Sequence, residues 1–181
     1  MNNAAIYPGT FDPVTYGHMD LIHRTLSVFD KVVVAVAVNP GKRPLFSIEE
    51  RVSLIKKAVG KNGLKNVTVE SFDTLLVDYC DQKKIYTVVR GLRAVSDFEY
   101  ELQLSQMNRK INKRVEAVFM MPSEEYNFIS SKIIKEVAAF GGDVSELVPA
   151  PVMEALRQKY VALKKTSASA KRKPGAIGKG K

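Results

Sequence analysis

Residues 32–38 read VVVAVAV, and this unbroken apolar run limits the fold more than any other stretch of the chain. A strand with one wet face alternates apolar and polar residues, whereas this run has no polar position. Such a run is typical of a strand covered on both faces, as in parallel sheets flanked by helices. The chain is therefore expected to fold as an α/β protein.

Other apolar segments continue an alternation of strand and helix. Strands are predicted at residues 4–6, 67–69, 86–89 and 115–120, in addition to 32–38. Helices are predicted at residues 17–29, 47–59, 97–112, 129–140 and 151–163, with a further one marked by Leu75, Leu76 and Tyr79. Strands separated by helices form parallel βαβ units. The expected architecture is a Rossmann-like, doubly wound, five-stranded parallel sheet with helices on both faces.

Local signals set the ends of some of these helices. Ser47 and Glu50 form a capping box at the start of the second one. Gly60 and Gly63 are expected to stop that helix, and residues 141–142 (GG) are expected to stop the one at 129–140.

Residues 7–18 read YPGTFDPVTYGH and directly follow the first predicted strand. A turn is expected at Pro8 and Gly9, and a helix is expected to start near Gly17 and His18. A helix N-terminus carries unpaired N–H groups and a partial positive charge, so it attracts phosphate. His18 can place a ring N–H on a phosphoryl oxygen there. This stretch therefore predicts that the chain handles nucleotides.

Further polar segments fall at the carboxyl ends of predicted strands. Lys42 follows the second strand, residues 90–93 (RGLR) follow the fourth, and residues 122–132 follow the fifth. In doubly wound sheets, ligands bind at this edge. The sequence holds neither GxGxxG nor GxxxxGK[ST], which disfavours a dinucleotide-dependent dehydrogenase and a P-loop enzyme.

These motifs resemble those of a known superfamily. Residues 15–18 (TYGH), preceded by residues 10–13 (TFDP), resemble the T/HxGH signature of nucleotidyltransferases. The variant with threonine first, together with RGLR and with DFEYE at 97–101, resembles the phosphopantetheine adenylyltransferases of coenzyme A synthesis. The resemblance covers about residues 4–160. It implies adenylyl transfer from ATP to 4′-phosphopantetheine, which gives dephospho-coenzyme A and pyrophosphate.

The resemblance also implies roles for individual residues. The implied catalytic set is His18, Thr10, Lys42 and Arg93, with His18 on the reacting phosphate. The phosphopantetheine side is expected to contact Thr10, Lys42, Leu76 and Arg90. ATP is expected to contact a larger set: Thr10, Phe11, His18, Gly91, Leu92, Arg93, Glu101, Tyr126, Asn127, Phe128, Ile129, Ser130, Ser131 and Lys132.

Several of these residues have a second interpretation. Core packing explains Leu76 equally well, and Ser130 and Ser131 can cap a helix as well as bind phosphate. Many relatives have tryptophan where Tyr126 stands and a small hydroxyl residue where Lys132 stands.

Adenylyl transfer makes few chemical demands on a protein. The phosphate of the acceptor is already ionised at neutral pH, so no general base is essential, and direct attack without a covalent enzyme intermediate is expected. The protein must hold two anionic groups in line and neutralise charge on the equatorial oxygens. His23 lies five positions after His18, about 140° around the helix, and is expected to be structural or exposed. No cluster has metal-ligand spacing, so Mg²⁺ is expected to arrive with ATP.

The net charge of +9 is concentrated at the C-terminal end of the sequence. Residues 164–181 hold seven basic residues and no acidic one, which leaves a net charge of +2 for residues 1–163. The expected division is a nucleotidyltransferase catalytic domain at 1–163 and a disordered basic tail at 164–181, because the tail lacks apolar periodicity. At most, weak and salt-sensitive contact with nucleic acid is expected from that tail.

Composition and resemblance also suggest a compartment and partners. The one cysteine, Cys80, cannot form an internal disulfide and fits a reducing compartment, so a cytoplasmic protein is expected. No stretch approaches the roughly 20 apolar residues that span a bilayer, and no membrane partner is expected. The resemblance implies a homohexamer, with coenzyme A as a feedback ligand.

Two alternatives remain open. A nucleotidyltransferase of the same fold that acts on nicotinamide mononucleotide or a polyol phosphate usually carries histidine where Thr15 stands. A nucleotide-sensing or RNA-binding protein would rely on the basic tail, but Thr10, His18, Lys42 and Arg90 count against a loss of catalysis.

Overall fold

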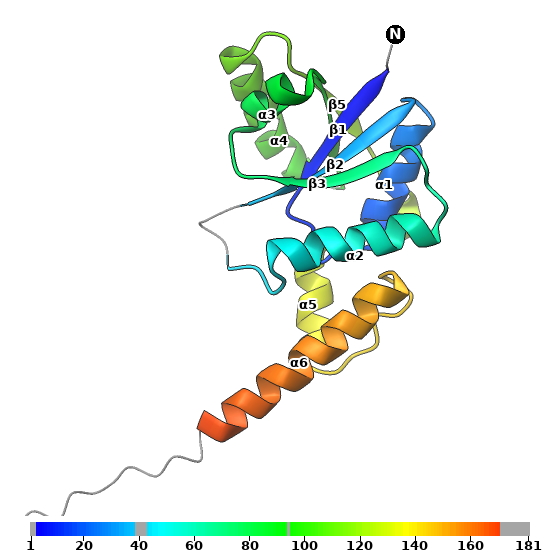
Figure 1. Ribbon diagram of the computed structural model, residues 1–181, viewed down its shortest axis with the longest axis vertical. Helices are drawn as coiled ribbons and strands as arrows, with labels where there is room; N and C mark the ends of the chain where they lie inside the picture. The colour runs from blue at the N-terminus through cyan, green and yellow to red at the C-terminus, as the bar shows by residue number, and fades with distance from the viewer. Residues whose placement is uncertain (1–2, 39–42, 94, 171–181) are drawn as a thin grey trace, which may run out of the picture.

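The computed structural model describes residues 3–38, 43–93 and 95–170. Its centre is a five-stranded parallel sheet with the strand order β3-β2-β1-β4-β5 (Figure 1). The strands are β1 (Ala4–Gly9), β2 (Lys31–Ala37), β3 (Val67–Phe72), β4 (Thr87–Gly91) and β5 (Glu116–Met120). The chain builds outward from β1 to β3 and then crosses back to β4, so the switch point lies between β1 and β4. The predicted α/β fold is confirmed.

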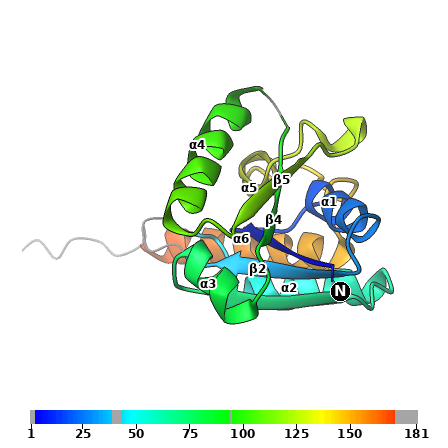
Figure 2. The ribbon, with the colours of Figure 1, turned by 90° about the horizontal axis from the view of Figure 1, so that it is seen from above.

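Helices cover both faces of this sheet (Figure 2). They are α1 (Tyr16–Leu26), α2 (Ile48–Lys61), α3 (Leu76–Lys83), α4 (Val95–Ile111), α5 (Ser131–Ala139) and α6 (Ala150–Ala170), with a short 3₁₀ turn, η1 (Glu124–Tyr126). α1 and α2 pack on one face, while α3 and α4 lie on the other. α6 packs against α2 and α5 and so lies outside the first of these layers.

The valine run explains why two layers are needed. Val32, Val34 and Val36 belong to the apolar cluster on the α1–α2 side. Val33 and Ala35 belong to a second cluster on the α3 side. All five side chains are buried, which removes roughly 25 cal/mol of unfavourable hydration for each Å² of apolar surface. β2 is therefore a central strand that only a sheet covered on both faces can accommodate.

The first strand is longer than predicted. The turn expected at Pro8 and Gly9 is wrong, because both residues lie in β1 and pair in register with Ala35 and Val36 of β2. Proline has no backbone N–H to donate within a sheet. Pro8 is tolerated in β1 because the strand pairs with β4 at Ile6 and Val88, two residues before Pro8. The reversal of the chain falls at residues 10–15 instead, which brings this turn to the carboxyl edge of the sheet.

The end of α2 also differs from the prediction. Gly60 lies inside the helix, which continues to Lys61, so only Gly63 acts as the stop. Gly63 has φ +66°, the left-handed conformation that glycine adopts at least cost after a helix C-cap. The amide of Leu64 donates to the carbonyl of Val59 across this turn, which satisfies one of the last helical carbonyls.

The last helix passes the predicted end of the catalytic domain. α6 continues to Ala170, so residues 164–170 are helical rather than disordered. The rest of the predicted tail, residues 171–181, lies outside the described residues. Within the described part of the chain, no helix is both long enough and apolar enough to cross a membrane.

Candidate active site

A cavity of about 580 Å³ opens at the carboxyl edge of the sheet, beside the switch point. It is lined by residues from the β1–α1 turn, the end of β4, α4 and the segment that follows β5. Most of the residues predicted to bind or react line it: Thr10, Phe11, His18, Arg90, Gly91, Arg93, Glu101, Tyr126, Ile129, Ser130, Ser131 and Lys132. The fold therefore gathers residues that lie up to 122 positions apart in the sequence.

The β1–α1 turn is tightly packed. Phe11 is 2% exposed and lies edge-on to Tyr7 and His18, with ring centroids 5.3 Å and 5.0 Å away. A Cβ on Gly9 would come within 2.8 Å of the Phe11 ring, so glycine leaves the space that the ring occupies. Phe11 itself has φ +49°, a conformation that a bulky side chain rarely adopts. The packing of this ring therefore fixes the backbone that presents Thr10.

His18 is held by the cap of its own helix. Thr15 is the N-cap of α1, and its backbone N–H donates to Nδ1 of His18 over 3.0 Å. The Thr15 hydroxyl also lies 2.8 Å from Nδ1 and accepts the backbone N–H of His18. Because Nδ1 accepts from a backbone amide, the proton of the neutral ring is on Nε2. Burial, and after it the charge of Arg93, lowers the pKa of His18 from 6.5 to about 4.

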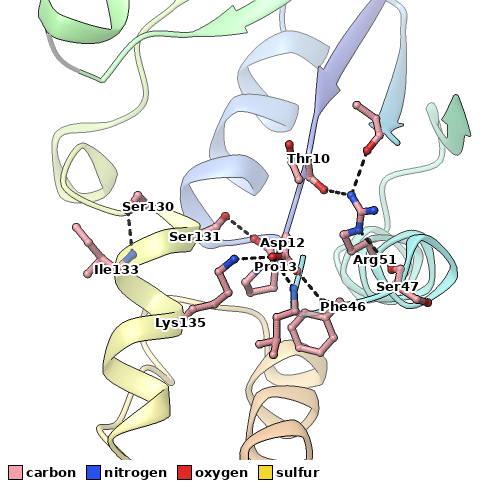
Figure 3. Close-up of polar contacts among 12 residues, drawn as sticks. Thr10, Asp12, Pro13, Phe46, Ser47, Arg51, Ser130, Ser131, Ile133 and Lys135 are labelled. Atoms are coloured by element: carbon pink, nitrogen blue, oxygen red, sulfur yellow. Dashed lines mark hydrogen bonds and ion pairs between the residues drawn. The ribbon is translucent and has the colours of Figure 1, made fainter. Parts of the chain in front are cut away.

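Asp12 joins three parts of the site (Figure 3). Its carboxylate is 4% exposed and accepts the backbone N–H groups of Leu45 and Phe46 at 3.0 Å and 2.9 Å. Lys135 of α5 forms an ion pair with the same carboxylate at 2.5 Å. The β1–α1 turn is thereby tied both to the segment before α2 and to α5.

Arg90 forms a two-pronged ion pair with Glu101. Its Nε and Nη2 donate to the two carboxylate oxygens at 2.6 Å and 2.5 Å, and Nη1 donates to the carbonyl of Pro8 at 3.1 Å. Both side chains are largely buried, and this geometry fixes the plane of the guanidinium. β4, α4 and β1 are therefore joined at the cavity wall. Gly91 next to it leaves space for Leu21 of α1, whose Cδ1 lies 2.4 Å from where a Cβ would stand.

The segment after β5 closes the opposite wall. Ser130 accepts the N–H of Ile133 and so caps α5, while Ser131 donates its hydroxyl to the carbonyl of Pro13 at 2.7 Å. The capping interpretation of Ser130 is thus confirmed, and Ser131 joins α5 to the β1–α1 turn (Figure 3). Arg93 donates to the carbonyl of Ile129 at 3.2 Å, which connects this segment to the end of β4.

Some predicted residues lie elsewhere. Leu92, Asn127 and Phe128 do not line the cavity; Leu92 donates its N–H to Met120 beyond the end of β4, and Phe128 is 64% exposed. Leu76 packs on the second apolar cluster, in agreement with the core interpretation, and Lys42 lies outside the described residues. His23 is exposed on α1, as predicted, and does not line the cavity.

Comparison with known proteins agrees with this geometry. The model of the cytidylyltransferase-like family matches residues 6–137. A phosphopantetheine adenylyltransferase from Anaeromyxobacter sp. (strain K) is 55% identical over 159 residues, which are 88% of this chain and 96% of that protein. The one from Thermodesulfovibrio yellowstonii is 52% identical over 161 residues, 88% of this chain and 99% of that protein. This chain belongs to the phosphopantetheine adenylyltransferase family. It is a nucleotidyltransferase.

A solved structure supports the fold alone. A crystal structure from Vibrio parahaemolyticus, provisionally assigned as a nicotinate-nucleotide adenylyltransferase, superposes with a TM-score of 0.68. It is 22% identical and the match covers 88% of this chain and 96% of that one. Members of the two groups thus share a backbone framework, so the acceptor has to be argued from the site residues.

Four residues of this chain lie in the cavity wall although the sequence analysis did not predict them there. Asp12, Thr15, Arg43 and Lys135 all line the cavity. Asp12 and Thr15 stand inside the motif that carried the resemblance, but their partners could be named only from the fold. Lys135 lies in the helix that begins at Ser131, where a lysine on a helix reads as solvated. A search for charged residues near the motifs would have found Asp12 and Arg43.

Proposed function

We propose that this chain transfers the adenylyl group of ATP to 4′-phosphopantetheine, giving dephospho-coenzyme A and pyrophosphate, in one in-line step. A phosphate oxygen of the acceptor forms a bond to the α-phosphorus, and the bond from that phosphorus to the bridging oxygen of pyrophosphate breaks. The identity of the curated relatives supports the reaction and the acceptor. The observation that carries the mechanism is the locked, neutral ring of His18 in the cavity wall.

The proposed role of His18 follows from its protonation. Nδ1 accepts from Thr15, so Nε2–H is the ring group available to a phosphoryl oxygen. A neutral N–H donor that is already oriented stabilises charge as it develops on the α-phosphate and needs no reorganisation. Thr10, on the backbone fixed by Phe11, orients the attacking phosphate, and Lys42, on the segment after β2, neutralises it. No step needs a covalent bond to the enzyme.

The charge of the cavity wall supports two anionic substrates. Its cations are Arg43, Arg90, Arg93, Lys132 and Lys135. Its carboxylates, Asp12 and Glu101, are each paired with a cation, Lys135 and Arg90. Arg90 and Arg93 lie at the end of β4, where their planar guanidinium groups match phosphate oxygens. In this proposal Arg90 faces the phosphate of the acceptor and Arg93 faces ATP.

The proposal includes Mg²⁺ that arrives bound to ATP. Among the described residues, no cluster of three histidine, cysteine or acidic side chains could hold a metal ion. Asp12 and Glu101 already neutralise cations of the chain. The cavity is therefore compatible with a Mg²⁺ ion held by the phosphate oxygens of ATP and by water, which are the ligands that Mg²⁺ prefers. The ion would add positive charge at the leaving pyrophosphate.

Release of pyrophosphate tests the reaction and the acceptor together. The assay supplies MgATP with 4′-phosphopantetheine, nicotinamide mononucleotide or glycerol 3-phosphate. Pantetheine, which lacks the attacking phosphate, serves as a control. Release with 4′-phosphopantetheine alone is the expected result. Release with another acceptor would keep the mechanism and overturn the substrate. No release from folded protein that binds ATP would favour a nucleotide sensor.

Assembly, compartment and regulation extend the proposal. α4 exposes the apolar side chains of Tyr100, Met107 and Ile111 on one face of the helix, which supports burial between copies of this chain. We propose a homohexamer, which light scattering on purified protein tests by its mass. Inhibition by coenzyme A, competitive with 4′-phosphopantetheine, is the proposed feedback. The proposed compartment is the cytoplasm, where the single buried thiol of Cys80 stays reduced.

A nucleotide-sensing or RNA-binding role is the second candidate, and the basic C-terminal residues alone favour it. Deletion of residues 171–181 decides between the two, because it leaves the described part of α6 in place. An enzyme keeps its turnover after this deletion, whereas a nucleic-acid binder loses its affinity.

A further inference from the structure

Arg51 is a buried cation in the layer beneath the site. It lies in the first turn of α2 and is only 4% exposed. Its Nη1 donates to the carbonyl of Thr10 at 2.8 Å and to the carbonyl of Ala37 at 3.2 Å (Figure 3). Its Nε donates to the carbonyl of Ser47, the N-cap of the same helix, at 3.3 Å. Arg51 does not line the cavity.

The two strand carbonyls occupy equivalent places at the edge of the sheet. β1 and β2 pair in parallel register up to Gly9 with Val36. Thr10 and Ala37 are the next residues along each strand, where the pairing ends. Arg51 thus joins the ends of β1 and β2 one residue beyond their last register pair. From this point β1 leads into the β1–α1 turn, which begins with Thr10, and β2 leads to the segment that contains Lys42 and Arg43.

A buried arginine bonded only to carbonyl groups is costly. Among the described residues, no carboxylate lies within ion-pair distance of Arg51, and desolvation lowers the pKa of its guanidinium. The negative charges of Asp12 and Glu49 oppose this shift. A buried charge that makes three hydrogen bonds is tolerable, whereas an apolar residue could fill the same space without the desolvation cost. The cost is explained if the bridge between the strand ends is needed.

We propose that Arg51 is a positioning residue for the phosphate acceptor. Its guanidinium holds the backbone of Thr10 and the start of the segment that follows β2 at a fixed separation. The backbone that it holds carries Thr10, which the proposed function assigns to the attacking phosphate, so this inference rests on that function. Most of the expected ATP contacts come from the end of β4 and the segment after β5, which Arg51 does not touch, whereas Thr10 is expected to contact both substrates. The acceptor side of the site therefore depends on Arg51 more than the ATP side does.

The test uses two substitutions of Arg51 and one matched control on the same helix. Arg51→Met removes the charge and keeps the length of the side chain, whereas Arg51→Lys keeps a cation but loses the planar group. Val59→Ala truncates a buried side chain in the last turn of α2 and supplies a destabilised variant that leaves the bridge intact. Steady-state constants for both substrates, Kd values from calorimetry and melting temperatures are measured for each.

The expected result separates the substrates. Arg51→Met lowers kcat/KM for 4′-phosphopantetheine about 100-fold, because a small displacement of a reacting group has this effect. The Kd of ATP changes less than about twofold, as for a substitution remote from the ligand. Arg51→Lys is impaired nearly as much, because an ammonium group cannot span the same carbonyls. Val59→Ala keeps the acceptor constants of the unaltered protein.

Several results overturn the proposal. One is an equal loss for both substrates, and another is an acceptor loss in Val59→Ala as large as that in Arg51→Met. If Arg51→Lys keeps the full kcat/KM for 4′-phosphopantetheine, the positive charge alone explains the role of Arg51 and the bridge between the carbonyls is not needed. If neither Arg51 variant folds, the guanidinium serves the fold alone. Should the unaltered protein bind 4′-phosphopantetheine without turnover, the proposed function fails, while the acceptor Kd still tests Arg51.

Discussion

The β1–α1 turn and the segment between β5 and α5 face the same cavity but differ in how far their side chains are fixed. In the turn, Phe11, Asp12 and Thr15 are at most 4% exposed, and the two polar ones have internal hydrogen-bond partners. On the other side, the Lys132 side chain at the start of α5 lines the cavity and is 86% exposed, and Phe128 in the segment before α5 is 64% exposed outside the cavity lining. One wall is set before any ligand arrives, whereas much of the other remains open to solvent.

This difference separates two tasks. Stabilisation of a transition state requires donors that do not move as charge develops, since reorganisation costs free energy at that moment. Binding of a nucleotide requires groups that can adapt, and part of their ordering accompanies binding. The contrast predicts that substitutions in the turn lower kcat, and that substitutions at exposed positions of the other wall change little.

The largest expected effect is that of His18→Ala. Loss of one preorganised donor should lower kcat roughly 1,000-fold, with little change in the Kd of ATP, because the donor acts mainly on the transition state. Turnover is followed by pyrophosphate release and ATP binding by calorimetry. His23→Ala, on an exposed face of the same helix, is the control. A change confined to KM would place His18 among the binding groups instead.

The protonation of His18 gives the second prediction. Its pKa is about 4 in the folded protein and 6.5 as a free side chain, so the folded ring binds a proton about 300-fold more weakly. Between pH 6.5 and pH 4 the unfolded chain therefore holds a proton that the folded chain lacks. Stability contributed by this group is present above pH 6.5 and is lost as pH falls toward 4.

NMR titration and thermal unfolding measure this shift directly. The His18 ring should remain neutral at pH 6.5, where a free imidazole is half protonated. His18→Gln should show a smaller loss of melting temperature between pH 7 and pH 4.5 than the unaltered protein. A ring that titrates near 6.5 would show that the turn does not fix its protonation, and the contrast between the two walls would weaken.

The third prediction concerns a substitution that removes the Thr15 hydroxyl beside His18 and leaves the imidazole ring in place. Thr15→Val keeps the shape of the side chain but loses the hydroxyl beside Nδ1, although the backbone N–H still donates. We expect kcat to fall about tenfold, as for other partners that orient a functional histidine. Loss of the N-cap should lower the free energy of unfolding by about 1 kcal/mol.

Thr25→Val is the matched control for this change. Thr25 is buried on the same helix and does not line the cavity, and its hydroxyl donates to the carbonyl of Leu21. It should cost a similar free energy of unfolding, about 1 kcal/mol, without a tenfold loss of kcat. Equal kcat losses in the two variants would mean that helix stability, rather than orientation of the ring, explains the effect of Thr15.

Much of the fold could be predicted because it depends on local patterns. The valine run required two covering layers, and the carboxyl-edge rule placed the motifs of β1, β4 and β5 together. The turn expected at Pro8 and Gly9 failed because pairing with β2 overrides a local turn signal. Gly60 failed as a stop because a helix tolerates an isolated glycine at a cost of about 1 kcal/mol.

The supporting contacts of the site could not be predicted in the same way. The ion pair of Asp12 with Lys135 joins residues 123 positions apart, and neither residue alone names its partner. Arg51 left a fainter signal, since it shares one helix face with the apolar residues Ile55 and Ala58. A cation on such an apolar face needs hydrogen-bond acceptors from elsewhere in the fold. The sequence could not identify the carbonyl of Thr10 as one of them, because that contact depends on how α2 packs against the sheet.

The smallest effect is expected on the open wall. The Lys132 side chain is 86% exposed, and its ion pair with Glu136 is long, at 4.0 Å. Lys132→Ser replaces this exposed charge with a small hydroxyl residue, so the KM of ATP should change by no more than about twofold, and kcat by less. Kinetics at low and high salt test this, because a screened surface charge loses its influence as salt rises. A fall in kcat as large as that of Thr15→Val would show that the open wall also acts on the transition state, and the division of tasks between the walls would not hold.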